Sequence, residues 1–306
     1  MATVTAPATA TAPLTLNDFK AQVPPDWCPG CGDFGVLNAL QQACAELKIP
    51  PHRLLVVSGI GCSSNLPGFF RSYGVHSLHG RAMPFATGAK LANHGMTVIA
   101  TGGDGDGYGI GLNHFIQAMR RNINVTYVVM NNEIYGLTTG QVSPTSEPGM
   151  KTKSTPLGNL EGMLNPLLLA LASGCGYVAR GFSGQVRHLV QLYKDGIQYP
   201  GFALIDVFSP CVTYNKQNTY DWFRGPKDNP RVYKLEEKGH APTDFHAAIE
   251  RAREWGDKIP IGLFYRNPNP RPPLDALDPG LQSGPLVDQR LGLSKEQRAK
   301  LIEEFM

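Results

Sequence analysis

Short apolar runs alternate with amphipathic stretches over the first two thirds of the chain. Each run ends in small or polar residues, as Ser58-Gly59 do after the first, which is typical of a strand buried in the centre of a sheet. The amphipathic stretches have apolar residues three or four positions apart and predict helices. The predicted strands are residues 54–57, 97–100, 124–130 and 202–208, and the predicted helices are residues 35–47, 86–94, 112–121, 163–173 and 185–194. This alternation predicts an α/β fold, a doubly wound parallel sheet with helices on both faces.

The two ends of the chain depart from this pattern. Residues 1–17 begin with an Ala/Thr/Pro tract that contains no Lys or Arg, so we expect a disordered tail rather than a secretory or transit peptide. The α/β domain is expected to cover residues 18–225. Residues 226–306 form a looser C-terminal extension without a core of its own, which we expect to contact a partner.

Two helices are predicted within this extension. Residues 243–255 carry apolar positions at helical spacing, with Thr243 as the expected N-cap. Residues 294–305 begin with Ser294 and Gln297 in the arrangement of a capping box.

Charge and composition exclude several classes of protein. The formal net charge is only +3 over 306 residues, which argues against a basic face for nucleic acid. No run of about 18 apolar residues is present, so a membrane-spanning helix is not expected. Without a secretion signal we expect a cytoplasmic protein whose six cysteines do not form disulfides. Cys44 and Cys175 lie in apolar stretches and are expected in the core.

Unusual polar or glycine-rich segments follow all four predicted strands. They are residues 60–63, 103–106, 131–132 and 209–211. In an open α/β sheet, ligands bind beyond the carboxyl ends of the strands. Four such segments at one edge therefore predict a single site.

The segment Gly103-Asp104-Gly105 has the features of a phosphate-binding loop. Glycines allow the backbone to approach a phosphate, whereas a carboxylate between them would repel it unless a magnesium ion lies between the two. Asn132 follows 28 residues later (132 − 104 = 28), enough for a helix and a returning strand that bring its amide oxygen beside Asp104. The simpler alternative is a glycine turn near a polar loop, but this spacing favours a metal-bound diphosphate.

Cys28 and Cys31 lie in a CxxC turn that directs two thiolates the same way. Four thiolates complete a tetrahedral zinc site or anchor an iron–sulfur cluster. Cys62 and Cys211 follow strands at the same edge and can supply the other two. Spacing alone does not decide between zinc and iron–sulfur.

Several motifs resemble known families. GDG followed 25 to 30 residues later by NN resembles the diphosphate motif of thiamine diphosphate enzymes. In the same order, six strings resemble the β subunit of 2-oxoacid:ferredoxin oxidoreductases over about residues 20–225. They are DWCPGCGDFG (26–35), GIGCSSNLP (59–67), HGRAMPFATGAKLAN (79–93), GDGDGYGIGLNHFIQAMRRN (103–122), NNEIYGLTTGQVSPTS (131–146) and SPCVTYN (209–215). IPIGLFYR (259–266) is also similar to this family.

The resemblance implies a thiamine-diphosphate-binding fold and three cofactors: thiamine diphosphate, Mg²⁺ and one [4Fe–4S] cluster. Cys28, Cys31, Cys62 and Cys211 match the cluster ligands. Asp104, Asn132 and the main-chain carbonyl of Ile134 match the magnesium ligands, and His79 is the catalytic candidate. The implied cofactor-binding set is Gly61, Ser63, His79, Gly103, Asp104, Gly105, Asp106, Asn132, Ile134, Tyr135, Gly136 and Leu137.

The activity implied by the resemblance is oxidative decarboxylation of a 2-oxoacid to an acyl-CoA, with electrons passed through the cluster to ferredoxin. Run in reverse, the same site would fix CO2. Such enzymes need a glutamate from a pyrimidine-binding domain, and this chain has one α/β domain and no obvious second copy. A larger α subunit is therefore expected to supply that glutamate and the coenzyme A contacts.

The motifs look most like those of the two-subunit members that act on 2-oxoglutarate and form succinyl-CoA, with pyruvate or a broad 2-oxoacid range as the alternative. Asn65 and Leu137 are expected to face the substrate tail, although some relatives carry Lys at the position of Asn65. Arg81 is the nearby cation that could pair with a distal carboxylate. Two other functions stay open: a non-redox thiamine enzyme with structural zinc, and a zinc-bearing scaffold subunit.

Overall fold

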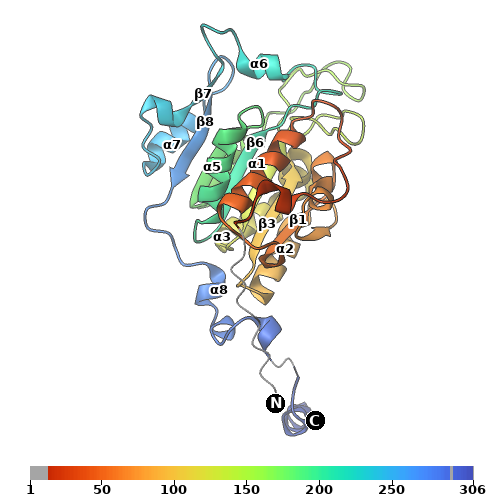
Figure 1. Cartoon of the computed structure of the whole chain (residues 1–306), viewed down its shortest axis with the longest axis vertical. Helices are drawn as coiled ribbons and strands as arrows, with labels where there is room; N and C mark the ends of the chain where they lie inside the picture. The colour runs from red at the N-terminus through yellow and green to blue at the C-terminus, as the bar shows by residue number, and fades with distance from the viewer. Residues whose placement is uncertain (1–12, 290–291, 306) are drawn as a thin grey trace.

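The computed structural model describes residues 13–289 and 292–305, which form an eight-stranded sheet with helices packed on it (Figure 1). The strand order is β2-β1-β3-β4-β6-β5-β8-β7. The strands are β1 (Leu54–Ser58), β2 (Tyr73–His76), β3 (Thr97–Gly103), β4 (Thr126–Asn131), β5 (Tyr177–Phe182), β6 (Ala203–Phe208), β7 (Val232–Lys234) and β8 (Ile259–Arg266). Most of the tail predicted for residues 1–17 lies outside the described residues, and Leu16–Phe19 forms a 3-10 helix.

The four predicted strands lie side by side as β1, β3, β4 and β6, and all four are parallel. Their registers pair Val56 with Ile99, Thr101 with Val128, and Val128 with Ile205. Parallel strands end at the same edge, so the four polar segments of the sequence meet there, as predicted. Strand β5 extends the parallel array beside β6.

Helices cover both faces of the sheet, which confirms the predicted architecture. Helices α1 and α5 pack on one face with residues such as Leu40 and Leu189, and α2, α3, α4 and α7 pack on the other with residues such as Phe115 and Leu171. Burying each such side chain contributes roughly 1.5–3 kcal/mol. The helices are α1 (Asp33–Glu46), α2 (Ala82–Ala92), α3 (Leu112–Arg120), α4 (Pro166–Ala172), α5 (Val186–Ile197), α6 (Tyr220–Arg224), α7 (Phe245–Ala252), α8 (Leu274–Leu277) and α9 (Lys295–Glu303).

Strand β5 was not expected from the sequence. Its apolar run is interrupted by Arg180 and Gly181. The structure buries Arg180 through an ion pair with Asp206 (Nε to Oδ2, 3.1 Å) and by stacking its guanidinium over the ring of Phe208, 4.9 Å from the centroid. A charge that is paired and stacked in this way can occupy a central strand.

The sheet continues into the C-terminal segment expected to begin at residue 226. Strand β8 pairs antiparallel with β5, and β7 lies beside β8. After Arg266 the chain leaves the sheet and runs along the molecule toward α8 and α9 (Figure 1). Arg271 ties this arm to the end of α3 by donating to the carbonyl of Arg120 (2.6 Å).

The predicted helix caps have different outcomes. The predicted N-cap Thr243 is wrong, because Oδ1 of Asp244 accepts from the backbone N–H groups of His246 (2.9 Å) and Ala247 (3.0 Å) and therefore caps α7. The capping box of Ser294 and Gln297 at the start of α9 is confirmed.

Every side chain of α9 is exposed. Within residues 13–289 and 292–305, no helix has the length and apolar character needed to cross a membrane.

Candidate active site

The loops after β1, β3 and β4 enclose a pocket at the carboxyl edge of the sheet, here called the GDG pocket. All twelve residues expected to bind the cofactor line it, together with Ile60, Cys62 and Thr138. They come from three loops and from the turn that carries His79. The structure thus brings together residues separated by more than seventy positions in the sequence, from Ile60 to Thr138.

Asp104 lies where β3 ends and a π-helical turn (Gly105–Ile110) begins. Its buried Oδ2 accepts a hydrogen bond from Oγ1 of Thr145 (2.7 Å). Burial raises the pKa of Asp104 to about 6, and the hydrogen bond from Thr145 is among those that oppose the shift. Oδ1 of Asn132 accepts from the backbone N–H of Ile134 (3.1 Å). A carboxylate, an amide oxygen and a nearby carbonyl are the oxygen donors that suit Mg²⁺.

Gly105 is required by close packing within this pocket. A Cβ at Gly105 would overlap the ring of Tyr135, whose hydroxyl donates to the carbonyl of Gly105 (3.1 Å). Burial raises the pKa of Tyr135, and the carboxylates of Asp104 and Asp106 act in the same direction. Tyr135 therefore stays protonated and acts as a hydrogen-bond donor.

His79 and Asp106, which both line the pocket, form a partly buried contact. Nδ1 of His79 lies 2.7 Å from Oδ1 of Asp106. The ring of His79 also meets the ring of Tyr135 edge-on, with 6.3 Å between centroids. Asp106 thus turns one oxygen toward the turn that carries His79.

The four cysteines expected to bind a metal group line a second pocket, here called the cysteine pocket. Cys28, Cys31, Cys62 and Cys211 all face it. The turn is closed by a hydrogen bond from Cys31 N to Cys28 O (2.9 Å), and Gly30 adopts a φ of +87° that other residues avoid. Among the described residues, no three His, Cys, Asp or Glu side chains converge as around a single bound ion.

The cysteine pocket and the GDG pocket share a wall. Cys62, Asn132, Gly136 and Leu137 line both. A Cβ at Gly136 would lie 3.6 Å from Sγ of Cys211 and 3.7 Å from Sγ of Cys62, so glycine leaves the space before these thiols open. The two pockets therefore form one continuous site.

Buried groups around the cysteine pocket oppose negative charge on its thiols. Burial raises the pKa of Cys62 to about 11, and the nearby carboxylate of Asp33 adds to the shift. Burial raises the pKa of Cys31 in the same way. Asp33 is itself buried, accepts from Oγ of Ser209 (2.6 Å), and has its pKa raised by burial to about 6. A cationic metal group would reverse this balance and hold the thiols as thiolates.

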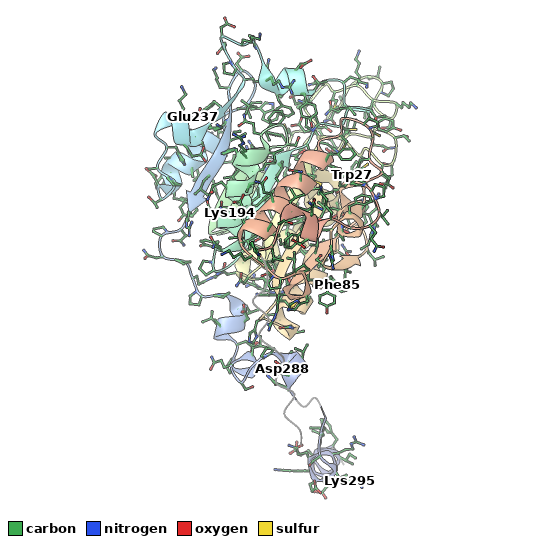
Figure 2. The ribbon with its side chains drawn as sticks, viewed as in Figure 1. Trp27, Phe85, Lys194, Glu237, Asp288 and Lys295 are labelled. Atoms are coloured by element: carbon green, nitrogen blue, oxygen red, sulfur yellow. The ribbon has the colours of Figure 1, made fainter. Side chains whose placement is uncertain are left out.

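Trp27, labelled in Figure 2, lines the cysteine pocket. Its Nε1 donates to the carbonyl of Cys62 (2.7 Å), and its ring packs edge-on against Phe34 and Phe69, at 5.4 and 5.0 Å between centroids. The tryptophan next to Cys28 therefore fixes the loop that carries Cys62. The other cysteines, Cys44 and Cys175, are buried in the hydrophobic core, as expected.

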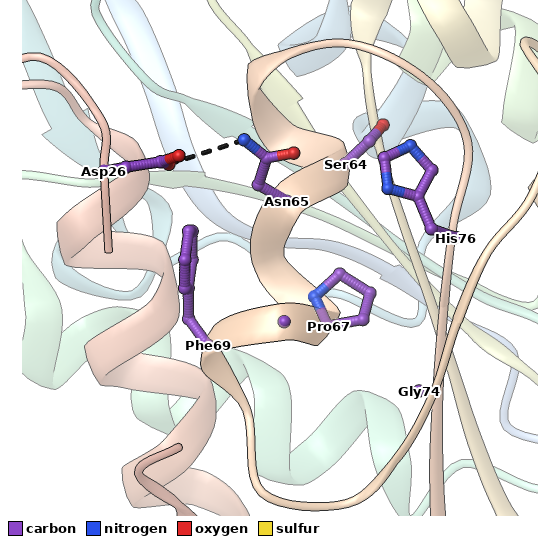
Figure 3. A pocket seen from close by; sticks show the side chains of 8 residues that line it. Asp26, Ser64, Asn65, Pro67, Phe69, Gly74 and His76 are labelled. Carbon is purple, nitrogen blue, oxygen red and sulfur yellow. Dashed lines mark hydrogen bonds between the residues drawn. The ribbon is translucent and has the colours of Figure 1, made fainter. Parts of the chain in front are cut away.

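Asn65 lies on the cysteine side of the site rather than in the GDG pocket. Residues Cys62–Phe69 form a 3-10 helix, in which positions three apart share a face, so Asn65 follows Cys62 toward the cysteine pocket. Figure 3 shows its amide pointing at Asp26, with 3.4 Å from Nδ2 to Oδ1, at the edge of a shallow pocket lined by Ser64, Pro67, Phe69 and His76.

The other two residues expected near the substrate differ in position. Leu137 lines both pockets and is 57% exposed. Arg81 precedes α2 and its guanidinium donates to the carbonyl of Gly80 (3.3 Å). It is adjacent to the turn of His79 but is not among the residues that line either pocket.

Sequence reasoning did not single out Thr145, Asp33 or Trp27. All three fall inside the quoted motifs, Thr145 in SPTS and the other two beside the CxxC turn. Their types gave no metal or catalytic signal, and their roles follow from contacts with Asp104, Ser209 and Cys62.

Comparisons with known proteins agree with this geometry. Residues 59–207 match the family model of the thiamine pyrophosphate enzyme C-terminal TPP-binding domain. Residues 211–282 match the C-terminal model of the pyruvate ferredoxin oxidoreductase beta subunit. The first match contains the GDG pocket, and the second begins at Cys211.

Individual relatives are similar over most of the chain. The beta subunit of 2-oxoacid:ferredoxin oxidoreductase 1 from Aeropyrum pernix is 49% identical, covering 83% of this chain and 81% of that protein. The 2-oxoglutarate oxidoreductase subunit KorB of Mycobacterium tuberculosis is 42% identical, covering 74% and 61%. A solved structure of the 2-oxoglutarate:ferredoxin oxidoreductase from Magnetococcus marinus, with 2-oxoglutarate, coenzyme A and succinyl-CoA bound, matches with a TM-score of 0.85 and 42% identity over 94% of this chain and 96% of that one.

Proposed function

Because the chain belongs to the β subunits of the 2-oxoacid:ferredoxin oxidoreductases, we propose that it acts on 2-oxoglutarate, forming succinyl-CoA and CO2 and passing two electrons to ferredoxin. The observation that carries the proposal is the shared wall of the GDG pocket and the cysteine pocket. Carbon chemistry in one pocket lies directly beside an electron acceptor in the other. Thiamine diphosphate is the cofactor of the family's TPP-binding domain.

The GDG pocket fits the diphosphate end of this cofactor. Asp104, Asn132 and the carbonyl of Ile134 would hold Mg²⁺, and Thr145 would orient the Asp104 carboxylate. When bound, thiamine diphosphate supplies the nucleophilic carbon and the electron sink that decarboxylation of a 2-oxoacid needs. Tyr135 packs against Gly105 and fixes the loop that follows Asn132.

The cysteine pocket fits an iron–sulfur cluster. Its donor set is four thiols from three loops, a set typical of [4Fe–4S] ligation, and Gly136 leaves space before two of them. When bound, the cluster supplies single-electron steps that carry the two electrons away in sequence. Cys62 lines both pockets, which supports transfer over a short distance.

The partner implied by the name β subunit is an α subunit, and we propose that it completes the GDG pocket. The rim of that pocket carries His79, whose side chain is 33% exposed, and the exposed Leu137. The partner would supply the glutamate that activates the cofactor and the contacts to coenzyme A. A distal carboxylate of the substrate would pair with a cation, either one from that partner or, within this chain, Arg81.

Two measurements on the complex of this chain with its α subunit test the proposal. We expect broad absorbance near 400 nm that a reductant bleaches, and reduction of ferredoxin that depends on both 2-oxoglutarate and coenzyme A. A colourless complex that contains zinc instead of iron would support the non-redox alternative. Reduction with pyruvate but not 2-oxoglutarate would support the alternative substrate.

A further inference from the structure

Three nitrogen atoms lie within hydrogen-bond distance of one oxygen of Asp106. Its Oδ1 lies 2.9 Å from the backbone N of Ile60, 2.7 Å from the backbone N of Gly80 and 2.7 Å from Nδ1 of His79. The residue is only 2% exposed. Backbone N–H groups can only donate, so Oδ1 accepts from Ile60 and Gly80, whereas the direction of the contact with His79 depends on where the imidazole carries its proton. The carboxylate therefore joins the loop after β1 to the turn that carries His79.

The surroundings of Asp106 are shaped for a carboxylate in this orientation. Its Oδ2 lies against the backbone of two glycines, and within the described residues it has no hydrogen-bond partner. A Cβ at Gly102 would lie 3.0 Å from Oδ2, and one at Gly59 would overlap the carboxyl group. Gly80 adopts a φ of +68°, and a Cβ there would lie 2.5 Å from the backbone N of Gly111. Packing thus fixes both the carboxylate and the turn.

We propose that Asp106 is the positioning residue that keeps the ring proton of His79 on Nδ1. A carboxylate oxygen can only accept, so Nδ1 must donate to it. In a neutral imidazole the other nitrogen then has a free lone pair. Nε2, the nitrogen that His79 can present to the GDG pocket that it lines, is therefore a hydrogen-bond acceptor.

This tautomer defines what His79 does in the reaction. An accepting Nε2 cannot donate to a diphosphate oxygen or to a carbonyl oxygen. It can take a proton from a hydroxyl or thiol of a bound reactant, so that the O–H or S–H bond breaks and an Nε2–H bond forms. Asp106 then stabilises the charge of the resulting imidazolium, as orienting carboxylates do in other active sites. The inference rests on the proposed function in placing His79 at the reacting groups.

A double-mutant cycle on the complex with the α subunit tests the role of Asp106. Asp106→Asn keeps the shape and the acceptor for the two backbone N–H groups but removes the charge. We expect kcat to fall about 10- to 100-fold, while KM for the 2-oxoacid and the affinity for thiamine diphosphate change less than about threefold. In a His79→Ala background the same substitution should change kcat less than about threefold, because the histidine that it orients is gone.

Asp33→Asn is the matched control. Asp33 is equally buried at the same edge of the sheet, but it contacts Ser209 rather than His79. Its effect should be equal with and without His79. If Asp106→Asn also has equal effects in the two backgrounds, or weakens cofactor binding as much as it lowers kcat, Asp106 acts on the fold or the cofactor and the inference is overturned.

A spectroscopic measurement decides the tautomer without using activity. Solid-state ¹⁵N NMR of the complex, with ¹⁵N-histidine in this chain, should show a protonated Nδ1 and an unprotonated Nε2 for His79, assigned by their absence in His79→Ala. A protonated Nε2 in the neutral ring would overturn the inference. If the wild-type complex oxidises no 2-oxoacid, the proposed function fails, and the NMR result still decides the position of the proton.

Discussion

The GDG pocket and the cysteine pocket share four lining residues, yet we propose that only the cysteine pocket is complete within this chain. All four thiols of the cysteine pocket come from the described chain, and Trp27 holds the Cys62 loop from within. The GDG pocket has an exposed rim, where Leu78, adjacent to His79, is 74% exposed. On the proposed function, electron transfer is built into this subunit, whereas carbon chemistry is divided between two subunits.

Separating the subunits should have the largest effect and tests this comparison directly. Expressed alone, the chain should retain iron but show no 2-oxoacid oxidation, because the activating glutamate is expected on the partner. Co-expression with the larger subunit should restore activity, in a symmetric pair of αβ units. Iron analysis and a ferredoxin-reduction assay on both preparations provide the measurement. Activity from the isolated chain would contradict the division of the site.

Asp104→Ala should affect only the GDG pocket. It removes the carboxylate that is expected to hold Mg²⁺, so the affinity for thiamine diphosphate should fall by about 100-fold or more. Iron content should be unchanged, because Asp104 does not line the cysteine pocket. Titration calorimetry with the complex measures the affinity, and a melting curve checks the fold. Wild-type affinity in this variant would show that the magnesium assignment is wrong.

Substitutions in the cysteine pocket should give the opposite pattern. Cys62→Ser and Cys211→Ser should each lower iron content several-fold while the complex still binds thiamine diphosphate. Cys44→Ser is the control, since Cys44 lies in α1 with its side chain buried in the core, and the iron content of this variant should match the wild type. The same iron content in all three variants would exclude the proposed ligand set.

The smallest expected effect concerns the choice of substrate at the open rim. We expect the complex to prefer 2-oxoglutarate over pyruvate by roughly tenfold or more in kcat/KM. A desolvated charge pair that stabilises the transition state for 2-oxoglutarate by about 1.4 kcal/mol more than that for pyruvate gives this factor. Steady-state kinetics with both acids provide the test. A preference for pyruvate would revise the substrate while leaving the two-pocket arrangement intact.

The centre of the fold could be predicted because its strands are buried on both faces. Strands β1, β3, β4 and β6 consist mainly of uninterrupted apolar residues, and the polar segments that follow them mark the site edge. Strand β5 could not be predicted, since Arg180 is acceptable there only through Asp206, 26 residues away. Strand β8 contains Pro260 and Gly262, and its place beside β5 depends on tertiary pairing.

In the candidate site too, the motifs could be predicted from the sequence, whereas contacts between residues far apart in the chain could not. The GDG motif, its spacing to Asn132 and the cysteine positions were readable from the sequence. The contact between Thr145 and Asp104 joins residues 41 positions apart and has no local signal. Asn65 was expected near the substrate because it follows Cys62 by three residues, and the 3-10 helix that contains both residues places Asn65 at the cysteine pocket.

The distribution of the four cysteines along the chain also determines when during synthesis all four thiols become available. Cys28 and Cys211 are 183 residues apart (211 − 28 = 183), and Cys211 follows β6. A growing chain on the ribosome offers at most three of the four thiols until that strand has been made, and contacts this distant in sequence form late in folding. If these four cysteines are the ligands, a metal group can gain its fourth thiolate only after β6 has been made, whereas β7 and β8 follow later in the chain.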